Sequence, residues 1–223
     1  MIDQVPGIAY RFRNPELLQA ALTHRSSSRL NNERLEFLGD SILNFVVASR
    51  LYELRPDNDE GDLSRLRSRV VRGDTLARLA AGLKLGDHLI MGDGELKSGG
   101  FQRGSILADA LEALFGAVYL DGGFEACREV IRAVCDEVIE DLPDAEQLKD
   151  PKTRLQEWMQ ARARPLPEYE LLREEGAEHA KRFVIRARLP DSGDEATASG
   201  NSRRKAEQAA ASTLLRLLLE NGR

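Results

Sequence analysis

The chain has 223 residues, of which 42% are hydrophobic and 31% are charged, and its formal net charge is −5. This composition fits a soluble globular protein with one large domain or two smaller ones. No apolar run approaches the roughly 20 residues of a membrane-spanning helix, and no basic region followed by an apolar stretch begins the chain. We therefore expect no membrane partner and no signal peptide.

Cysteine and histidine are scarce, which bears on the redox compartment and on the class of metal. Cys127 and Cys135 lie in one predicted helix, where eight residues separate them by about 12 Å, too far for a disulfide bond. Three scattered histidines and the lack of a Cys-x-x-Cys motif argue against a zinc site. We expect a cytoplasmic protein without an organic cofactor.

The net charge hides a difference between the two parts of the chain. Residues 1–150 contain 18 basic and 26 acidic side chains, a net charge of −8. Residues 151–223 contain 14 basic and 11 acidic side chains, a net charge of +3. An acidic part joined to a mildly basic part indicates two domains with different functions.

The first 140 residues predict an all-α domain. Apolar residues recur there at spacings of three and four, without a convincing two-residue alternation. Asn31 and Asn32 precede the second helix and are expected to cap it. Segment 92–104 is glycine-rich and predicts a mobile loop; it is not a phosphate-binding P-loop, because the Gly-Lys-Ser/Thr ending is missing. The expected helices span residues 16–22, 33–51, 63–82, 106–120 and 124–139.

The last third of the chain predicts a small α+β domain. Residues 141–151 are acidic, contain two prolines and indicate a linker. An α-β-β-β-α order follows, with helices at 152–163 and 202–219 and strands at 168–173, 181–189 and, more weakly, 195–199. Alternation in the second strand places Phe183, Ile185, Ala187 and Leu189 on one face and Arg182, Arg186 and Arg188 on the other.

Two of the predicted helices each contain a small acidic cluster. On a helical wheel of about 100° per residue, Glu33, Glu36 and Asp40 share one face of the second helix. Asp109 and Glu112 likewise share a face of the helix at 106–120. Most acidic helix faces are simply solvated. Carboxylates gathered on two mostly apolar helices instead favour a divalent-metal site, and all-oxygen ligands favour Mg²⁺ or Mn²⁺.

Phe37 breaks the pattern of the second helix. It falls at about 40° on the wheel, beside the carboxylates rather than on the apolar side. A phenylalanine in that position is either exposed, as in an ordinary monomer, or buried by a partner. The apolar side consists of Leu35, Leu38, Ile42 and Phe45.

The last helix starts with three cations. Arg203, Arg204 and Lys205 stand in its first turn, where the helix dipole disfavours positive charge. One interpretation is a solvated basic turn. The other is a phosphate clamp, in which the helix N-terminus, a serine cap and basic side chains all face an anion. The α-β-β-β-α order around this turn favours the clamp.

Residues 152–219 resemble a double-stranded-RNA-binding domain. The similarity lies in segments 152–157 (KTRLQE), 176–179 (GAEH) with Phe183, and 200–210 (GNSRRKAEQAA). It implies that Gln156, Glu157 and His179 contact minor grooves, and that Arg203, Arg204 and Lys205 grip phosphates across about 16 base pairs. Two residues depart from the family pattern, Ala198 at a usual glycine and Glu207 at a frequent lysine. A loop histidine satisfied by backbone remains the alternative for His179.

Four segments of the first domain resemble the ribonuclease III family in sequence and in order. They are residues 32–40 (NERLEFLGD), 59–65 (DEGDLSR), 94–100 (GELKSGG) and 105–113 (SILADALEA). The resemblance covers residues 10–219, nearly the whole chain. It implies an all-helical nuclease and dimerisation domain at 1–145, a linker at 146–151 and a double-stranded-RNA-binding domain at 152–223.

The resemblance also implies residue roles. Glu36, Asp40, Asp109 and Glu112 would bind the metal, and Asp40 and Glu112 would be the catalytic carboxylates. Glu33 and Glu60 match further acidic positions of the family, with possible salt-bridge or supporting roles. Phe37 would pack into the partner subunit of a homodimer. These six acidic residues and one phenylalanine are the predicted nuclease site and its interface.

The expected activity is metal-assisted hydrolysis of double-stranded RNA. The family resemblance implies staggered cuts with 5′-phosphate and 3′-hydroxyl ends, and a role in processing ribosomal RNA precursors and other structured transcripts. One alternative is a duplex-binding regulator whose nuclease half only dimerises. The other is a phosphohydrolase of small esters, which would leave the RNA-binding domain without a purpose.

Overall fold

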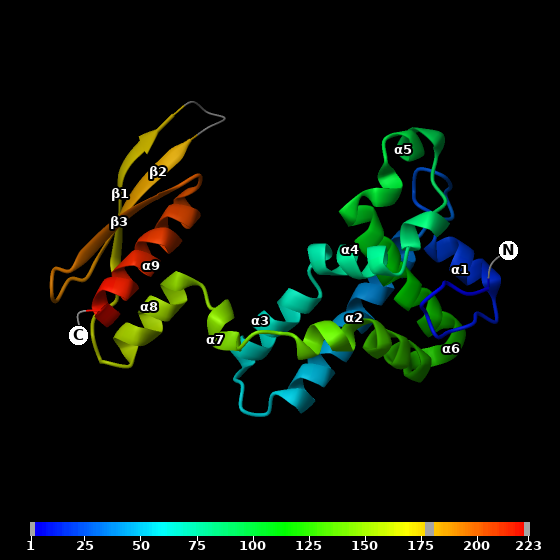
Figure 1. Ribbon diagram of the computed structural model, residues 1–223, viewed down its shortest axis with the longest axis horizontal. Coiled ribbons are helices and arrows are strands. Elements are labelled where there is room, and N and C mark those ends of the chain that lie inside the picture. The colour runs from blue at the N-terminus through cyan, green and yellow to red at the C-terminus, as the bar shows by residue number, and fades with distance from the viewer. Residues whose placement is uncertain (1–2, 177–180, 221–223) are drawn as a thin grey trace. The chain divides into compact units, whose positions relative to one another are not determined.

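The computed structural model describes residues 3–176 and 181–220 and divides the chain into two compact units. Residues 1–147 form the first, which we call the helical unit, and residues 148–223 form the second, which we call the α/β unit. Figure 1 shows helices alone in the first and a three-stranded sheet with helices in the second. The predicted fold class, an all-α domain followed by an α-β-β-β-α domain, is confirmed.

Two long helices form the centre of the helical unit. Helix α6 buries apolar residues on several sides, among them Leu111, Leu114 and Phe115, each fully buried. Helix α2 packs along it through Leu35, Leu43 and other residues of its apolar stripe. The helices of this unit are α1 (Pro15–Ala21), α2 (Glu33–Leu54), α3 (Glu60–Val70), α4 (Gly73–Gly82), α5 (Asp93–Lys97) and α6 (Gly104–Glu140), with 3₁₀ turns η1 (Leu85–His88) and η2 (Gly100–Gln102).

Two glycines bring α2 and α6 unusually close together. A Cβ atom built on Gly39 would lie 1.8 Å from the backbone oxygen of Glu112. A Cβ atom on Gly116 would lie 2.3 Å from the backbone oxygen of Leu35. Both distances are impossible for real side chains, so only glycine permits this crossing. A glycine in the middle of a helix costs about 1 kcal/mol of stability. Gly39 is nevertheless required, because it allows Glu36 of α2 to lie against Glu112 of α6.

Helix α6 joins the two helices expected at 106–120 and 124–139. Its helical course is interrupted at Gly123, whose backbone has φ 81° and ψ −178°. Asp121 stabilises the bend from outside, because its carboxylate accepts hydrogen bonds from the Tyr10 hydroxyl at 2.8 Å and from the backbone N–H of Arg13 at 2.8 Å. The glycine therefore separates two helical arms, as the sequence pattern predicted.

Two predictions for the helical unit are wrong. The helix expected at 63–82 is two helices, because Arg72 adopts an extended backbone (φ −64°, ψ 142°) and the Thr75 hydroxyl donates to the carbonyl of Arg69. The loop expected at 92–104 contains α5 and η2, held together by an ion pair of 2.7 Å between Glu95 and Arg103. In both segments a local polar contact accompanies a backbone course that the sequence pattern did not indicate.

The α/β unit packs two helices on one face of an antiparallel sheet. The strand order is β1-β2-β3, with Ile185 of β2 opposite Leu171 of β1 and Ala198 of β3. Ile185, Leu155 and Leu214 are fully buried in the core between sheet and helices. The elements are α8 (Pro151–Gln160), β1 (Glu168–Glu175), β2 (Arg182–Arg188), β3 (Glu195–Gly200) and α9 (Arg203–Glu220).

The segment expected as a linker contains a short helix, α7 (Ala145–Leu148), between the elements of the two units. The expected division into residues 1–145, 146–151 and 152–223 stays a prediction. None of the helices within residues 3–176 and 181–220 combines the length and the apolar character that crossing a membrane requires.

Substituting Gly39→Ala should destabilise the protein strongly. The new methyl group meets the backbone of α6 and forces the two central helices apart, which costs on the order of 3 kcal/mol or more. Thermal unfolding measures this loss. Gly82→Ala is the matched control, because nothing lies within 4 Å of a Cβ atom there, and we expect it to change stability by less than about 1 kcal/mol. Equal effects of the two substitutions would contradict the close-approach argument.

Candidate metal centre and nucleic-acid interface

Three carboxylates from two helices meet at the crossing of α2 and α6. Glu36 comes from α2, and Asp109 and Glu112 come from α6 one turn apart. One oxygen atom of each lies within 4.8 Å of the other two. The glycine contact described above places Glu112 beside α2 at this level. This geometry, with oxygen donors only, suits a hard divalent cation such as Mg²⁺ or Mn²⁺.

Asp40, the fourth predicted ligand, is not one of the three carboxylates that meet. It follows Glu36 by one helical turn, and its Oδ1 accepts a hydrogen bond of 2.8 Å from the Asn44 side chain. Its charge raises the pKa of Glu112. The structure therefore brings three of the four predicted carboxylates together and places Asp40 within electrostatic reach of them.

The carboxylates of the cluster resist ionisation. Burial raises the pKa of Glu112 to about 8, and the charges of Asp40, Glu36 and Asp109 add to this shift. Burial also raises the pKa of Glu36, followed by the charge of Asp109. The pKa of Asp109 is raised by burial, while His24 and Arg25 act in the opposite direction. A bound cation would relieve both the desolvation and the repulsion.

Glu33 and Glu60 lie outside the cluster. Within the part of the chain that the structure describes, the group of potential metal ligands includes neither of them. Glu33 pairs with Arg25 at 3.5 Å, and its charge contributes to the raised pKa of Glu36. Glu60, in the first turn of α3, accepts a hydrogen bond of 2.9 Å from the Ser64 hydroxyl. Their geometry fits supporting roles rather than direct ligation.

A cavity of about 470 Å³ opens beside the cluster. Glu36 and Asp109 line one part of it, and Arg25, Asn32 and Arg103 line others. Sequence reasoning did not assign a site role to His24, Arg25, Asn32, Glu95 or Arg103. Two of these residues lie in the motifs that resemble the family, Asn32 in 32–40 and Glu95 in 94–100, and this was the available signal; His24, Arg25 and Arg103 lie outside those motifs.

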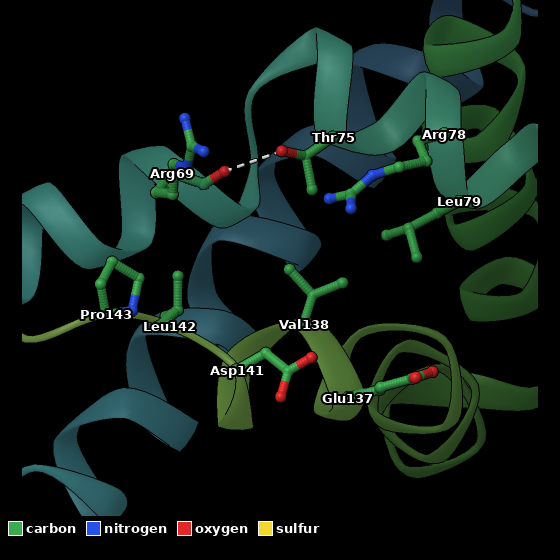
Figure 2. Close-up of a pocket in the computed structure, with 9 residues that line it drawn as sticks. All are labelled: Arg69, Thr75, Arg78, Leu79, Glu137, Val138, Asp141, Leu142 and Pro143. Carbon is green, nitrogen blue, oxygen red and sulfur yellow. Dashed lines mark hydrogen bonds between the residues drawn. The ribbon is translucent and has the colours of Figure 1, made fainter.

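Another cavity, of about 330 Å³, is lined by none of the three clustered carboxylates, Glu36, Asp109 and Glu112. It is formed between the junction of α3 and α4 and the C-terminal end of α6 (Figure 2). Arg69 and Arg78 line one side of it and Glu137 and Asp141 the other, with the Thr75 hydroxyl bonded to the Arg69 carbonyl. None of the predicted site residues lines this cavity, so it is not part of the metal centre.

Three aromatic side chains of α2 are exposed on the helical unit. Phe37 is 78% exposed, Phe45 60% and Tyr52 75%. Phe45 belongs to the predicted apolar side of α2 but is not buried in this unit; its ring contacts Phe124 edge-on at 5.7 Å. A cavity of about 250 Å³ lies beside these two rings. Exposed aromatic residues gathered on one helix mark an interaction surface.

The start of α9 has the features of a phosphate clamp. Ser202 caps the helix, since its hydroxyl accepts a hydrogen bond of 3.2 Å from the N–H of Lys205. Arg204 and Lys205 are exposed and form no ion pair with any residue that the structure describes. Arg203 instead pairs with Glu207 at 3.2 Å. Two of the three predicted cations thus remain available to an anion.

Both departures from the RNA-binding pattern are accommodated structurally. Glu207 forms ion pairs with Arg203 and, at 3.0 Å, with Lys152 of α8, so it ties the two helices together. Ala198 is partly buried against the core of the unit. Gly200, two residues after Ala198, is sterically required, because a Cβ atom there would lie 2.6 Å from the backbone nitrogen of Ala206.

The remaining predicted RNA contacts are placed in part. Gln156 is exposed on α8, and the neighbouring Glu157 is half-buried in an ion pair of 2.6 Å with Lys149. His179 lies outside the described residues.

Removing the charge of Glu112 should stabilise the metal-free protein in a pH-dependent way. A raised pKa means that the folded protein holds a proton that the unfolded chain releases, so the contribution of Glu112 to wild-type stability falls as pH rises from about 4.5 to about 8. In EDTA, the melting temperature of Glu112→Gln should exceed that of the wild type by a margin that grows over this range. Glu140→Gln, an exposed position at the end of the same helix, should show no such trend. A constant margin would contradict the assigned cause.

Comparison with known proteins agrees with this geometry. Residues 14–138 match the family described as Ribonuclease-III-like, and residues 151–218 match the double-stranded RNA binding motif. The chain is 56% identical to Ribonuclease 3 of Alkalilimnicola ehrlichii, over 95% of this chain and 92% of that protein. It is 54% identical to Ribonuclease 3 of Nitrosococcus oceani, again over 95% of this chain and 92% of that protein.

Solved structures agree as well. The nuclease domain of ribonuclease III from Campylobacter jejuni is 40% identical, with a TM-score of 0.58, over 61% of this chain and 94% of that domain. A second structure of that nuclease domain, described for flexibility in a region involved in dimer formation, is 43% identical with a TM-score of 0.57, over 57% of this chain and 90% of that one. With matches along nearly its whole length, this chain belongs to the ribonuclease III family.

Proposed function

We propose that this protein is an endoribonuclease that cleaves double-stranded RNA by metal-assisted hydrolysis of phosphodiester bonds. The observation that supports this most is the meeting of Glu36, Asp109 and Glu112 within 4.8 Å at a helix crossing. Family membership gives the reaction class, and the double-stranded RNA binding motif at 151–218 gives the class of substrate.

Glu36, Asp40, Asp109 and Glu112 would hold Mg²⁺, and Mn²⁺ could replace it. When bound, the metal activates water and neutralises charge at the phosphate. Asp40 and Glu112 are the catalytic carboxylates of the proposal, in addition to their role as ligands. Glu112 must lose its proton before it can bind a cation, and its pKa of about 8 makes this step sensitive to pH near neutrality. Glu33 and Glu60 support the site from outside.

The active form is a homodimer. Phe37, together with Phe45 and Tyr52, exposes an aromatic surface on α2 that a second copy would cover. One metal centre cuts one strand, so two centres related by a two-fold axis cut both strands of a duplex. The products are staggered and bear 5′-phosphate and 3′-hydroxyl ends.

The α/β unit supplies much of the affinity for the duplex. Arg203, Arg204 and Lys205 contact phosphates, and Gln156, Glu157 and His179 contact minor grooves. The helical unit is acidic, and it repels RNA until a cation binds. Ribosomal RNA precursors and other structured transcripts are the proposed substrates, and the cytoplasm is the proposed location, which suits the two buried free cysteines.

Incubation with an end-labelled RNA duplex tests the activity directly. With Mg²⁺ we expect short duplex products with staggered ends on both strands, and with EDTA none. Glu112→Gln should lower the cleavage rate by at least about a hundredfold, because it removes a charged ligand, while duplex binding stays within a few-fold. Glu140→Gln should cut like the wild type. Tight binding by the wild type without any cleavage would instead support a duplex-binding regulator.

Neutralising the start of α9 should weaken duplex binding and its dependence on salt. The double variant Arg204→Ala/Lys205→Ala loses two phosphate contacts, so the slope of log affinity against log salt should fall by about 1 to 2. Arg216→Ala, at an exposed arginine farther along the same helix, should leave affinity and slope unchanged. An unchanged slope in the double variant, measured by filter binding across a salt series, would remove the clamp from the proposal.

A further inference from the structure

The cavity beside the metal centre is bordered by the starts of two helices. Asn32 and Glu33, at the start of α2, and Ser105 and Ile106, at the start of α6, all line it. The start of a helix presents unsatisfied N–H groups and the positive end of the helix dipole. The N–H groups that remain free at such helix starts are donors that suit an anion.

Asn32 is a buried polar side chain without a protein partner. It is only 3% exposed although it lines the cavity. Its backbone is satisfied, since its N–H donates to the Thr23 carbonyl and its carbonyl accepts from the N–H of Glu36, both at 2.9 Å. Its side-chain amide forms no hydrogen bond with any described residue and does not cap α2.

The cap expected from Asn31 and Asn32 is supplied by Asn31 alone. The Asn31 Oδ1 accepts the N–H of Glu33 at 3.1 Å. The Asn32 amide is therefore not needed by the helix, and it lies at the border of the cavity. The polar side chain of a largely buried residue that has no protein partner and borders a cavity is available to a ligand.

The start of α6 adds further donors on the same side. Its N-cap residue, Arg103, forms no side-chain cap, and the N–H groups of Gly104, Ser105 and Ile106 have no acceptor among the residues that the structure describes. Arg103 itself is oriented by its ion pair with Glu95 and by a hydrogen bond of 3.3 Å to Ser98.

The lining of the cavity combines carboxylates with hydrogen-bond donors. The carboxylates are those of Glu33, Glu36, Glu95 and Asp109, and the donors are those of Arg25, Asn32, Arg103 and the start of α6. With a cation held by Glu36 and Asp109, a phosphodiester group would find partners for its negative charge in both the cation and the donors.

We propose that the side-chain amide of Asn32, with the first N–H groups of α6 and Arg103, forms a subsite for a phosphate oxygen of the RNA strand that is cut. This inference rests on the proposed function and adds to it a substrate-binding residue outside the carboxylates. Asn32 contacts the phosphate directly and holds it against the metal centre.

The kinetic test compares Asn32→Ala and Asn32→Asp with the wild type on an end-labelled RNA duplex in Mg²⁺. We expect kcat/KM to fall at least tenfold for Asn32→Ala, as for the loss of a hydrogen bond to a charged group, and further for Asn32→Asp, whose carboxylate repels the phosphate. Asn31→Asp, with the same change of charge one residue away and its capping oxygen retained, should stay within about twofold of the wild type. Values for both Asn32 variants within twofold of the wild type would overturn the subsite.

Two further measurements separate binding of phosphate from a structural or metal-binding role. Thermal unfolding and calorimetric Mn²⁺ binding should match the wild type for Asn32→Ala; a parallel loss of Mn²⁺ affinity would overturn the phosphate assignment. With duplexes substituted at random by phosphorothioates, one position that hinders wild-type cleavage should no longer hinder Asn32→Ala. Identical interference patterns would overturn the subsite even if the variant is slow. A wild type that does not cut duplex RNA would instead overturn the proposed function itself.

Discussion

The close contact between α2 and α6 is the constraint on which the rest of the helical unit depends. Gly39 and Gly116 let the two backbones meet where any side chain would collide with a carbonyl group. The contact lies within one turn of Glu36 and Glu112, so the same crossing that closes the core also determines the distance between carboxylates of different helices. A wider crossing would bury more side-chain volume but would separate the charges that a single cation must bridge.

The cluster that results is unfavourable by itself. Burial raises the pKa values of Glu36, Asp109 and Glu112, and the charges of neighbouring carboxylates add to this shift for Glu36 and Glu112. Folding therefore holds these groups together against their electrostatic preference. The core around Phe115 and Leu111 supplies the stability that offsets this cost. Buried carboxylates that repel one another are typical of sites whose ligand completes the electrostatics, so this cluster suits a cation.

The α/β unit has basic side chains at the start of α9, in contrast to the acidic cluster of the helical unit. Helix α9 begins with cations, which the helix dipole disfavours. Glu207 pairs with Arg203, whereas Arg204 and Lys205 form no ion pair with the residues that the structure describes. Glu207 in turn binds Lys152 and so joins α8 to α9. A residue that departs from the family pattern thus contributes to the packing of the unit, while Arg204 and Lys205 remain exposed.

Helix and strand periodicity determined that Glu36, Asp40, Asp109 and Glu112 lie on helix faces, that the chain has an all-α part and an α-β-β-β-α part, and that residues 106–120 and 124–139 form separate helical segments. These are local properties, set by residues a few positions apart. The crossing of α2 and α6 was decided by the tertiary structure, because it depends on the fit of two surfaces about seventy residues apart in the chain. The same holds for the cavity, which Asn32 and Arg103 both line. No local pattern reveals that the Asn32 amide is left without a partner, since this follows only from what packs around it.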